Sequence, residues 1–408
     1  MPAAQEQKSG LVTTELQRAL DRSSLPPSDG SLVLDVANLV EYEQTWRLNA
    51  DEWRGLLSEP SYLDRELFLA DAEICREGGA TAWILTDGSK KIPQTADGSR
   101  PILASCETNR KNAYVAKDGK LEKVVSHGIG SVYTRPEYRG MGYAARMISE
   151  LGKKLDNFQQ LKSKKGAFSV LYSDIGTKFY ARHGWTPFPS THITLQPIDN
   201  LGEYHQRLAE ITPKRKLKDL TTIDINDLSA SWASQLEDKL IHISAQEPNK
   251  TYVAFKPEPV QFHWHFLRQE FLAEYIGREK PNVNGVLDVE TGTALVWTRT
   301  YSLEASEWHL SILYTHIPKN SQHGEKDLRQ ALSCLMLRAQ WEAKIWDMVA
   351  GAEIWDPNDV VVSAARDIAR GQEVNVISRD QEHICSLKWN GSESDDVVWL
   401  ANERYAWC

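Results

Sequence analysis

Hydrophobic and polar positions in the first part of the chain follow patterns that predict both strands and helices. LVLDV, residues 32–36, alternates as a strand does, whereas residues 40–57 carry apolar side chains at helical spacing. A short strand is predicted over residues 81–88, ending in the turn dipeptide Asp-Gly. Two longer strands follow over residues 101–116 and 122–134, separated by KDGK, which favours a hairpin turn.

A glycine-containing turn, RPEYRGMGYAARM, comes directly after the last of these strands, and a helix is predicted over residues 143–158. Residues 166–174 form an apolar run of strand length. Residues 175–185 have helical spacing that stops at Gly184, because glycine commonly ends helices. The predicted order is therefore strand, helices, three strands, helix, strand and helix.

The second half of the chain shows a similar alternation. Ten of the fourteen tryptophans lie beyond residue 200, so this half must also fold around a core. Its predicted elements are helices over residues 236–246 and 260–277, strands over 283–302 and 307–317, a helix over 326–344, a strand over 348–356, a helix over 360–370 and strands over 383–390 and 396–408. This order indicates either a degenerate copy of the first domain or an unrelated α+β domain.

Length and composition add the broad class of protein. A chain of 408 residues is too long for one ordinary core, so we expect two domains. We place a flexible arm at residues 1–30, which end near the Ser/Pro/Gly stretch SSLPPSDGS, a first domain at residues 31–200 and a second at 201–408. The polar N-terminus lacks the apolar segment of a signal peptide, and a cytoplasmic protein is expected.

Charge and cysteine content narrow the possible partners. A formal net charge of -9 disfavours nucleic acid and anionic membranes. The five cysteines are scattered, without a CxxC pair, which is typical of a reducing compartment. Neither a metal site nor a disulfide framework is predicted, and the sequence indicates no particular oligomeric state.

The glycine turn is the strongest candidate for a binding site. Arg139, Gly142 and Ala144 fill the pattern Arg/Gln-x-x-Gly-x-Gly/Ala between a strand and a helix. Backbone N–H groups at a helix N-terminus attract anions, so a pyrophosphate is the expected ligand. The alternative is a tight turn that binds nothing. A Walker loop is excluded because no Lys-Ser/Thr pair closes the turn, and a dinucleotide-binding motif would stand earlier in the fold.

VYTRPEYRGMGYAARM and the later LYSDIGTKFYARHGW resemble the acyl-CoA-binding motif and the next strand-helix motif of the GNAT N-acetyltransferase superfamily. The resemblance to the superfamily covers residues 32–197. Within the superfamily, the same motifs most resemble the fungal lysine N6-acetyltransferases, which are enzymes of lysine degradation. The resemblance implies a mixed α/β GNAT domain, and we expect the C-terminal α+β domain, whether a degenerate GNAT-like copy or an unrelated fold, to cap the acceptor site. The loop PKNSQHGEKD lacks the glycine pattern, so no second CoA site is predicted.

The resemblance implies acetyl-CoA as co-substrate and assigns residues to it. The strand ending in Val132, Tyr133 and Thr134 would run beside the pantetheine arm. The turn that would hold the pyrophosphate comprises Arg139, Gly140, Met141, Gly142, Tyr143 and Ala144. A strand N–H could polarise the acetyl carbonyl, and direct attack by a neutral amine would follow.

Candidate catalytic and substrate residues follow from the same resemblance. Tyr180 occupies the place of the tyrosine that protonates the leaving thiolate in many relatives. His127 lies near the strand position of a glutamate base, but Gly128 is closer to it, so a structural histidine is the stronger interpretation. The terminal carboxylate of Cys408 could be a base. Ser173 and Asp174 are candidates for substrate contact, with a helix N-cap preferred for Asp174.

The function predicted from these residues is acetyl transfer to a primary amine, with the ε-amine of free L-lysine as leading acceptor. A polyamine or protein-lysine acetyltransferase is the alternative within the same fold. A non-catalytic acyl-CoA-binding or regulatory module is the alternative from another class.

Overall fold

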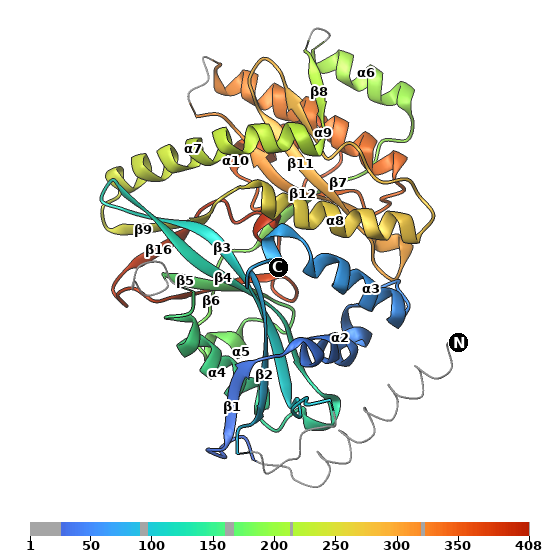
Figure 1. Ribbon diagram of the computed structural model, residues 1–408. Coiled ribbons are helices and arrows are strands. Elements are labelled where there is room, and N and C mark those ends of the chain that lie inside the picture. Colours follow the sequence, from blue (N-terminus) through green and yellow to red (C-terminus); the bar gives the residue numbers. More distant parts are fainter. Residues whose placement is uncertain (1–25, 90–96, 160–166, 213–214, 320–322, 408) are drawn as a thin grey trace.

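Two mixed β-sheets surrounded by helices make up the protein, as Figure 1 shows. The computed structural model describes residues 26–89, 97–159, 167–212, 215–319 and 323–407. The expectation of a mixed α/β protein is confirmed. The flexible arm predicted at residues 1–30 lies almost entirely outside the described residues.

The first sheet has nine described strands, arranged β1-β2-β3-β4-β5-β15-β6, with β9 on the far part of β3 and β16 beside β9. Their bounds are β1 Leu32–Val36, β2 Ala80–Asp87, β3 Ala104–Lys117, β4 Lys120–Thr134, β5 Phe168–Ser173, β6 Thr186–Pro187, β9 Lys250–Phe255, β15 Ile384–Trp389 and β16 Asp396–Trp399. Most neighbours are antiparallel, but β4 and β5 are parallel, as are β9 and β16.

The second sheet has seven described strands in the order β14-β7-β13-β12-β11-β10-β8. Their bounds are β7 Thr191–Leu195, β8 Leu217–Leu220, β10 Gly285–Asp288, β11 Ala294–Thr300, β12 His309–His316, β13 Ala352–Trp355 and β14 Ile377–Ser378. Strands β12 and β13 are parallel and are joined by a helix, as β4 and β5 are in the first sheet. The predicted repetition of element order is therefore present in this strand-helix-strand unit.

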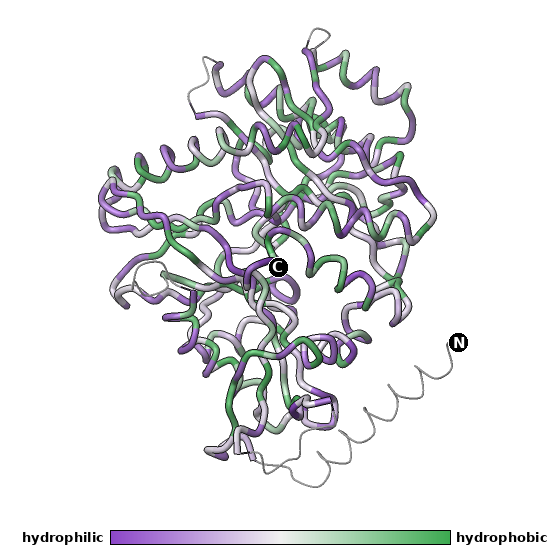
Figure 2. Tube along the Cα trace, in the orientation of Figure 1, coloured by the Kyte–Doolittle hydropathy of each residue, from purple (hydrophilic) through white to green (hydrophobic). Residues whose placement is uncertain are grey.

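In Figure 2 the tube of α7 alternates between hydrophilic and hydrophobic segments along its length. The described α-helices are α2 Leu39–Trp53, α3 Glu59–Ala70, α4 Tyr143–Leu155, α5 Lys178–Ala181, α6 Leu201–Ile211, α7 Thr222–Gln246, α8 Pro259–Tyr275, α9 Glu325–Ile345 and α10 Asp359–Ile368. No helix within the described ranges is long and apolar enough to cross a membrane.

The hairpin of β3 and β4 is the longest feature of the first sheet. Asp118 and Gly119 connect the strands with φ angles of 51° and 71°, so both residues of the turn are left-handed. A two-residue turn of this hand matches the twist of the flanking strands. The hairpin predicted from KDGK is thus confirmed.

The two sheets exchange strands. β7, which precedes residue 200, pairs with β13 of the second sheet, while β15 pairs with β5 and extends the first sheet. The sheets therefore do not divide at the domain boundary predicted near residue 200, and that boundary itself stays a prediction. Because each sheet contains a strand from the other half, their folding is expected to be coupled.

Packing of α2 and α3 brings the two halves together. Trp46 of α2 and Tyr62 of α3 belong to the same apolar core as Leu335 of α9 and Ile354 of β13. A separate core fixes α4 against the first sheet around Met147 and Trp185. A hydrogen bond from Trp46 Nε1 to Glu107 joins α2 to β3 of the hairpin.

Candidate active site

A β-bulge interrupts the hairpin near the middle of the first sheet. Ser105 of β3 pairs with Tyr133, but Glu107 pairs with Gly130, so two residues of β4 oppose one residue of β3. Ser131, within the bulge, has a φ of 51°, which is uncommon for a residue other than glycine. Bulges of this kind often occur beside active sites because they redirect a side chain or a backbone group.

The bulge stands where β4 and β5 separate. Their parallel pairing joins residues 127–129 to residues 169–171, although both strands continue beyond it. A cavity of about 220 Å³ opens at this point, lined by Ser131 and Val132 of β4 and by Leu171 and Tyr172 of β5. The separation exposes backbone polar groups of two strands to one small space.

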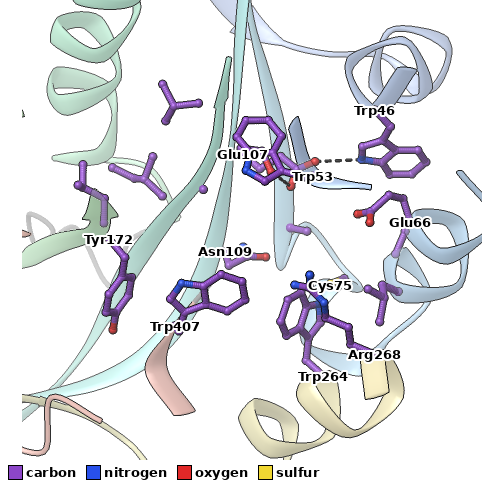
Figure 3. Close-up of a pocket in the computed structure, with 18 of the residues that line it drawn as sticks. Trp46, Trp53, Glu66, Cys75, Glu107, Asn109, Tyr172, Trp264, Arg268 and Trp407 are labelled. Carbon is purple, nitrogen blue, oxygen red and sulfur yellow. Dashed lines mark hydrogen bonds between the residues drawn. The ribbon is translucent and has the colours of Figure 1, made fainter. Parts of the chain in front are cut away.

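Aromatic residues from both halves of the chain enclose this cavity, and Figure 3 shows several of them around the opening. The aromatic lining from helices and from the C-terminal segment consists of Tyr42, Trp46, Trp53, Tyr62, Tyr180, Trp264 and Trp407. Apolar walls exclude water, and this strengthens electrostatic interactions inside the cavity.

Glu107 places a carboxyl group in the cavity. Trp46 Nε1 donates a hydrogen bond of 3.0 Å to Glu107 Oε1, and Ser131 Oγ donates one of 3.1 Å to Oε2 (Figure 3 shows the first). Burial, with a smaller contribution from the negative charge of Glu66, raises the pKa of Glu107 to about 7. A carboxyl group with this pKa is partly ionised near neutral pH and can accept a proton.

Sequence reasoning missed Glu107. It stands in PILASCETNR, and it is the one acidic side chain of β3. This single carboxyl group is the sequence signal that could have identified Glu107. In the structure its neighbours Cys106 and Thr108 are both buried. The enclosing helices α2, α3 and α8 come from distant parts of the sequence, so burial of Glu107 could not be read locally.

Tyr180 of α5 lies in the same cavity as Glu107 and is 7% exposed. Burial raises the pKa of its phenol above the ordinary value, so the hydroxyl keeps its proton at neutral pH. The helix predicted over residues 175–185 is shorter in the structure, where α5 covers Lys178–Ala181 and Gly184 follows with a φ of 97°.

Asp174 also lines the cavity, but it is not the helix cap expected from the sequence. The N-cap residue of α5 is Thr177. Asp174 Oδ1 instead accepts a hydrogen bond of 2.8 Å from the backbone N–H of His383, just before β15. Ser173 Oγ donates to Gly176 O at 2.8 Å, which closes the turn that carries Asp174. Ser173 itself is buried and outside the set of cavity-lining residues.

His127 lies away from the cavity lining. Its Nε2 is 3.2 Å from Gln159 Oε1, and its ring packs against Phe158. Burial lowers the pKa of His127 to about 4, so the imidazole is neutral at pH 7. This environment agrees with the structural interpretation. Cys408 is outside the described residues, but the preceding residue, Trp407, lines the cavity.

The glycine turn ends β4 and begins α4 as the sequence predicted. Gly140 and Gly142 have φ angles of 76° and 95°, a region that only glycine adopts without strain. Gly142 is the N-cap residue of α4 and offers no side chain to bond the first-turn N–H groups. A Cβ on Gly140 would meet no heavy atom within 4 Å, so this part of the turn faces open space.

The side chain of Arg139 stiffens the turn. Its Nε donates to the backbone O of Thr134 at 3.1 Å, and its Nη2 pairs with Glu52 at 2.7 Å. The guanidinium also lies 5.5 Å from the ring centroid of Tyr133. An uncapped helix N-terminus held in this way suits the pyrophosphate of an acyl-CoA.

A bulged strand that separates from its parallel neighbour, with a glycine turn at its end, is the arrangement that the GNAT resemblance implied. Residues 192–408 match the family model described as "LYC1 GNAT-like C-terminal domain", which covers more than half of the chain. The chain belongs to this GNAT/LYC1-like acetyltransferase family, and the family expected from the sequence is confirmed.

Relatives of the chain include two yeast proteins. An uncharacterized protein of Saccharomyces cerevisiae is 24% identical over 410 residues, covering 93% of this chain and 98% of that protein. A protein of Yarrowia lipolytica named lysine acetyltransferase is 26% identical over 269 residues, covering 57% of this chain and 64% of that protein.

Solved structures with a similar overall arrangement are more distant. A GCN5-related N-acetyltransferase from Kribbella flavida has a TM-score of 0.48 and 14% identity, covering 88% of this chain and 72% of that one. Eis1 from Mycobacterium abscessus has a TM-score of 0.43 and 13% identity, covering 88% of this chain and 73% of that one.

Proposed function

We propose that the protein transfers the acetyl group of acetyl-CoA to a primary amine of a small molecule, with the ε-amine of free L-lysine as the leading acceptor. The observation that carries the proposal is the presence of Glu107 and Tyr180 in one cavity where β4 and β5 separate. The two groups have the protonation states that a base and an acid need at neutral pH.

Binding of the co-substrate would use the turn after β4. The backbone N–H groups of residues 139–144 would hold the pyrophosphate, and the backbone of Val132 to Thr134 would lie beside the pantetheine arm. Bound there, acetyl-CoA would supply an acetyl group activated as a thioester. A backbone N–H at the bulge would polarise its carbonyl oxygen.

Removal of a proton from the acceptor is the main demand on the protein. Only about one lysine ε-amine in a few thousand is neutral at pH 7, since its pKa is near 10.4. Glu107 would accept that proton and Trp46 would hold its carboxylate in position. The terminal carboxylate of Cys408 remains the alternative base, next to Trp407 of the cavity wall.

Protonation of the leaving group would complete the transfer. As the new C–N bond forms and the C–S bond breaks, Tyr180 would give its proton to the departing sulfur. The attacking nitrogen would lose its second proton to the phenolate of Tyr180, and the proton held by Glu107 would pass to solvent. Each group would return to its starting state.

The acceptor is proposed to be small because side chains from several helices and strands surround the cavity. Trp264 of α8 and Trp407 form part of the cavity wall, so the second half of the chain would cap the acceptor site. A protein substrate would need an open groove for its backbone. L-lysine is preferred because one relative, covered over 64% of its length, carries the name lysine acetyltransferase.

An amine panel tests the proposal. The protein is incubated with acetyl-CoA and L-lysine, spermidine, a lysine-containing peptide or glucosamine, and thiol release and product mass are measured. We expect L-lysine to give a product that is about 42 Da heavier, which is the mass added when one acetyl group replaces a hydrogen. The acetyl group should be on the ε-nitrogen. Reaction of spermidine or the peptide but not of lysine would contradict the assignment of L-lysine as the acceptor. The absence of thiol release with every amine would contradict the proposed acetyltransferase activity.

A further inference from the structure

Arg268 of α8 brings a guanidinium into the wall of the candidate active site. Its Cζ lies 5.8 Å from the ring centroid of Trp264 and 5.5 Å from that of Trp407, so two indoles flank it. All three side chains line the cavity that contains Glu107. In Figure 3, Arg268 and Trp264 come from α8 and lie apart from Glu107, which belongs to β3.

The cation of Arg268 has no carboxylate partner among the residues that the structure describes. Arg65, which also lines the cavity, is different: its Nε donates to Glu66 at 2.9 Å and its Nη2 is 2.5 Å from the same oxygen. Glu66 is thus paired with Arg65, and although its charge partly offsets the lowered pKa of Arg268, no ion pair between Glu66 and Arg268 is present. An arginine in an aromatic cavity without an anion is costly, unless a ligand supplies the anion.

The electrostatics at this position favour an anionic group. Burial, together with the positive charge of Arg65, lowers the pKa of Arg268 to about 9. The environment therefore disfavours the cation, and a bound carboxylate would reverse this effect. The planar guanidinium can also donate two parallel hydrogen bonds to a carboxylate, which fixes the orientation of the ligand.

We propose that Arg268 binds the carboxylate of the acceptor, while Glu107 faces the amine that is acetylated, so that the acceptor class is an amino acid with a side-chain amine. This inference rests on the proposed function and adds the residue that selects the acceptor. A polyamine would place an ammonium group against the guanidinium instead. Like charges in a cavity of low dielectric repel, so polyamines should be poor substrates.

The test compares L-lysine with cadaverine, which is lysine without its carboxylate. We expect the wild-type protein to prefer L-lysine. Arg268→Gln should lower kcat/KM for L-lysine about 10- to 100-fold, mainly through KM, as expected for a charge-assisted hydrogen bond. The same variant should leave kcat/KM for cadaverine unchanged or higher. Arg268→Lys keeps the positive charge but loses the two parallel N–H donors, so its kcat/KM for L-lysine should lie between those of the wild type and Arg268→Gln. This variant provides the test if Arg268→Gln does not fold.

Arg278→Gln is the matched control. Arg278 also lies over an indole, 5.5 Å from the centroid of Trp346, and pairs with Asp347, but it is outside the cavity lining. Arg278→Gln should leave kcat/KM unchanged for both L-lysine and cadaverine. An equal loss on L-lysine and cadaverine in Arg268→Gln would assign Arg268 a packing role and overturn the inference. A KM for L-lysine that is unchanged in Arg268→Gln would do the same.

Calorimetric binding separates this inference from the proposed function. Titration of L-lysine and cadaverine into the wild-type protein and Arg268→Gln should show a 10- to 100-fold weaker complex for L-lysine alone, on the order expected for that bond. Binding through Arg268 without acetyl transfer would contradict the function and leave the inference standing. Acetylation of L-lysine by Arg268→Gln with wild-type kinetics, or no binding of L-lysine by the wild type, would overturn the inference.

Discussion

Ser131 Oγ donates a hydrogen bond of 3.1 Å to Glu107 Oε2 and so joins the bulge of β4 to the carboxyl group in the cavity. The bulge has two consequences. It turns the hydroxyl of Ser131 toward Glu107, and it stands where β4 separates from β5. The local geometry that opens the cleft therefore also tunes the proposed base, since a donor to a carboxylate favours its ionised form.

Removing that donor should shift the pH dependence of the reaction. In Ser131→Gly the positive φ is retained at no steric cost, while the hydrogen bond to Glu107 is lost. The pKa of Glu107, already raised to about 7, should rise further by about one unit. Profiles of kcat/KM against pH, measured by thiol release, should move to higher pH by this amount. An unchanged profile would show that Ser131 does not act on the titrating group.

Glu107→Gln should remove the base while keeping the shape of the side chain. Because the ionised form of Glu107 is the active one, the wild-type rate should rise as pH increases through about 7. The glutamine variant should lose this rise, and kcat at neutral pH should fall about 10²- to 10⁴-fold. Fluorescence titration should show unchanged CoA affinity. A variant with wild-type kcat would exclude Glu107 as the base.

The terminal carboxylate of Cys408 can be tested against Glu107 by extending the chain with two glycines. This change displaces the carboxylate but keeps Trp407, which lines the cavity. With Glu107 as base, kcat should change less than about tenfold, and the rise in rate near pH 7 should persist. A terminal carboxylate has an ordinary pKa of about 3.5, so it would not by itself produce that rise. Loss of activity on extension, with Glu107→Gln active, would reverse the assignment.

Tyr180→Phe should slow the departure of the thiolate. The phenol is buried and protonated, and the phenylalanine variant keeps its packing against Phe179. We expect kcat to fall about 10²-fold with CoA affinity retained. Tyr204→Phe, which alters a buried tyrosine of α6 outside the cavity lining, is the control and should keep its kcat. Equal effects of both substitutions would indicate a loss of packing rather than of an acid.

Local signals were sufficient to predict the glycine turn, the hairpin and most of the helices. Gly140 and Gly142 have the left-handed conformation that their pattern indicated, and Asp118-Gly119 forms the expected turn. These features depend on the φ angles of a few neighbouring residues. The helix cap at Asp174 was predicted wrongly because Ser173 closes a turn that delays α5 until Lys178.

Long-range pairing was beyond local prediction. The segment containing β15 was expected to be a strand, but its sequence carries no information on its partner, which is β5 rather than a strand of the second sheet. The same limit applies to the cavity. Glu107 and Arg268 become recognisable only when β3 and α8 are placed on either side of one space, more than a hundred residues apart in the chain.

A buried ion pair between β11 of the second sheet and α9 should affect the stability of both sheets. Arg299 and Glu342 pair at 0% and 2% side-chain exposure, and Arg338 Nη1 donates to the second carboxylate oxygen at 2.8 Å. Glu342→Gln leaves the buried Arg299 without its carboxylate partner, whereas Arg338 keeps its pair with Asp219. The expected loss in the free energy of unfolding is about 3–5 kcal/mol.

Urea unfolding measures this loss, with Asp367→Asn as control. Asp367 pairs with Arg329 at side-chain exposures of 35% and 43%, so its neutralisation should cost less than about 1 kcal/mol. Because β7 and β15 are exchanged between the sheets, tryptophan fluorescence and acetyl transfer should be lost in one transition, shifted to lower urea in Glu342→Gln. Two separate transitions, with activity surviving the first, would show that the first sheet folds without the second and that strand exchange does not couple them.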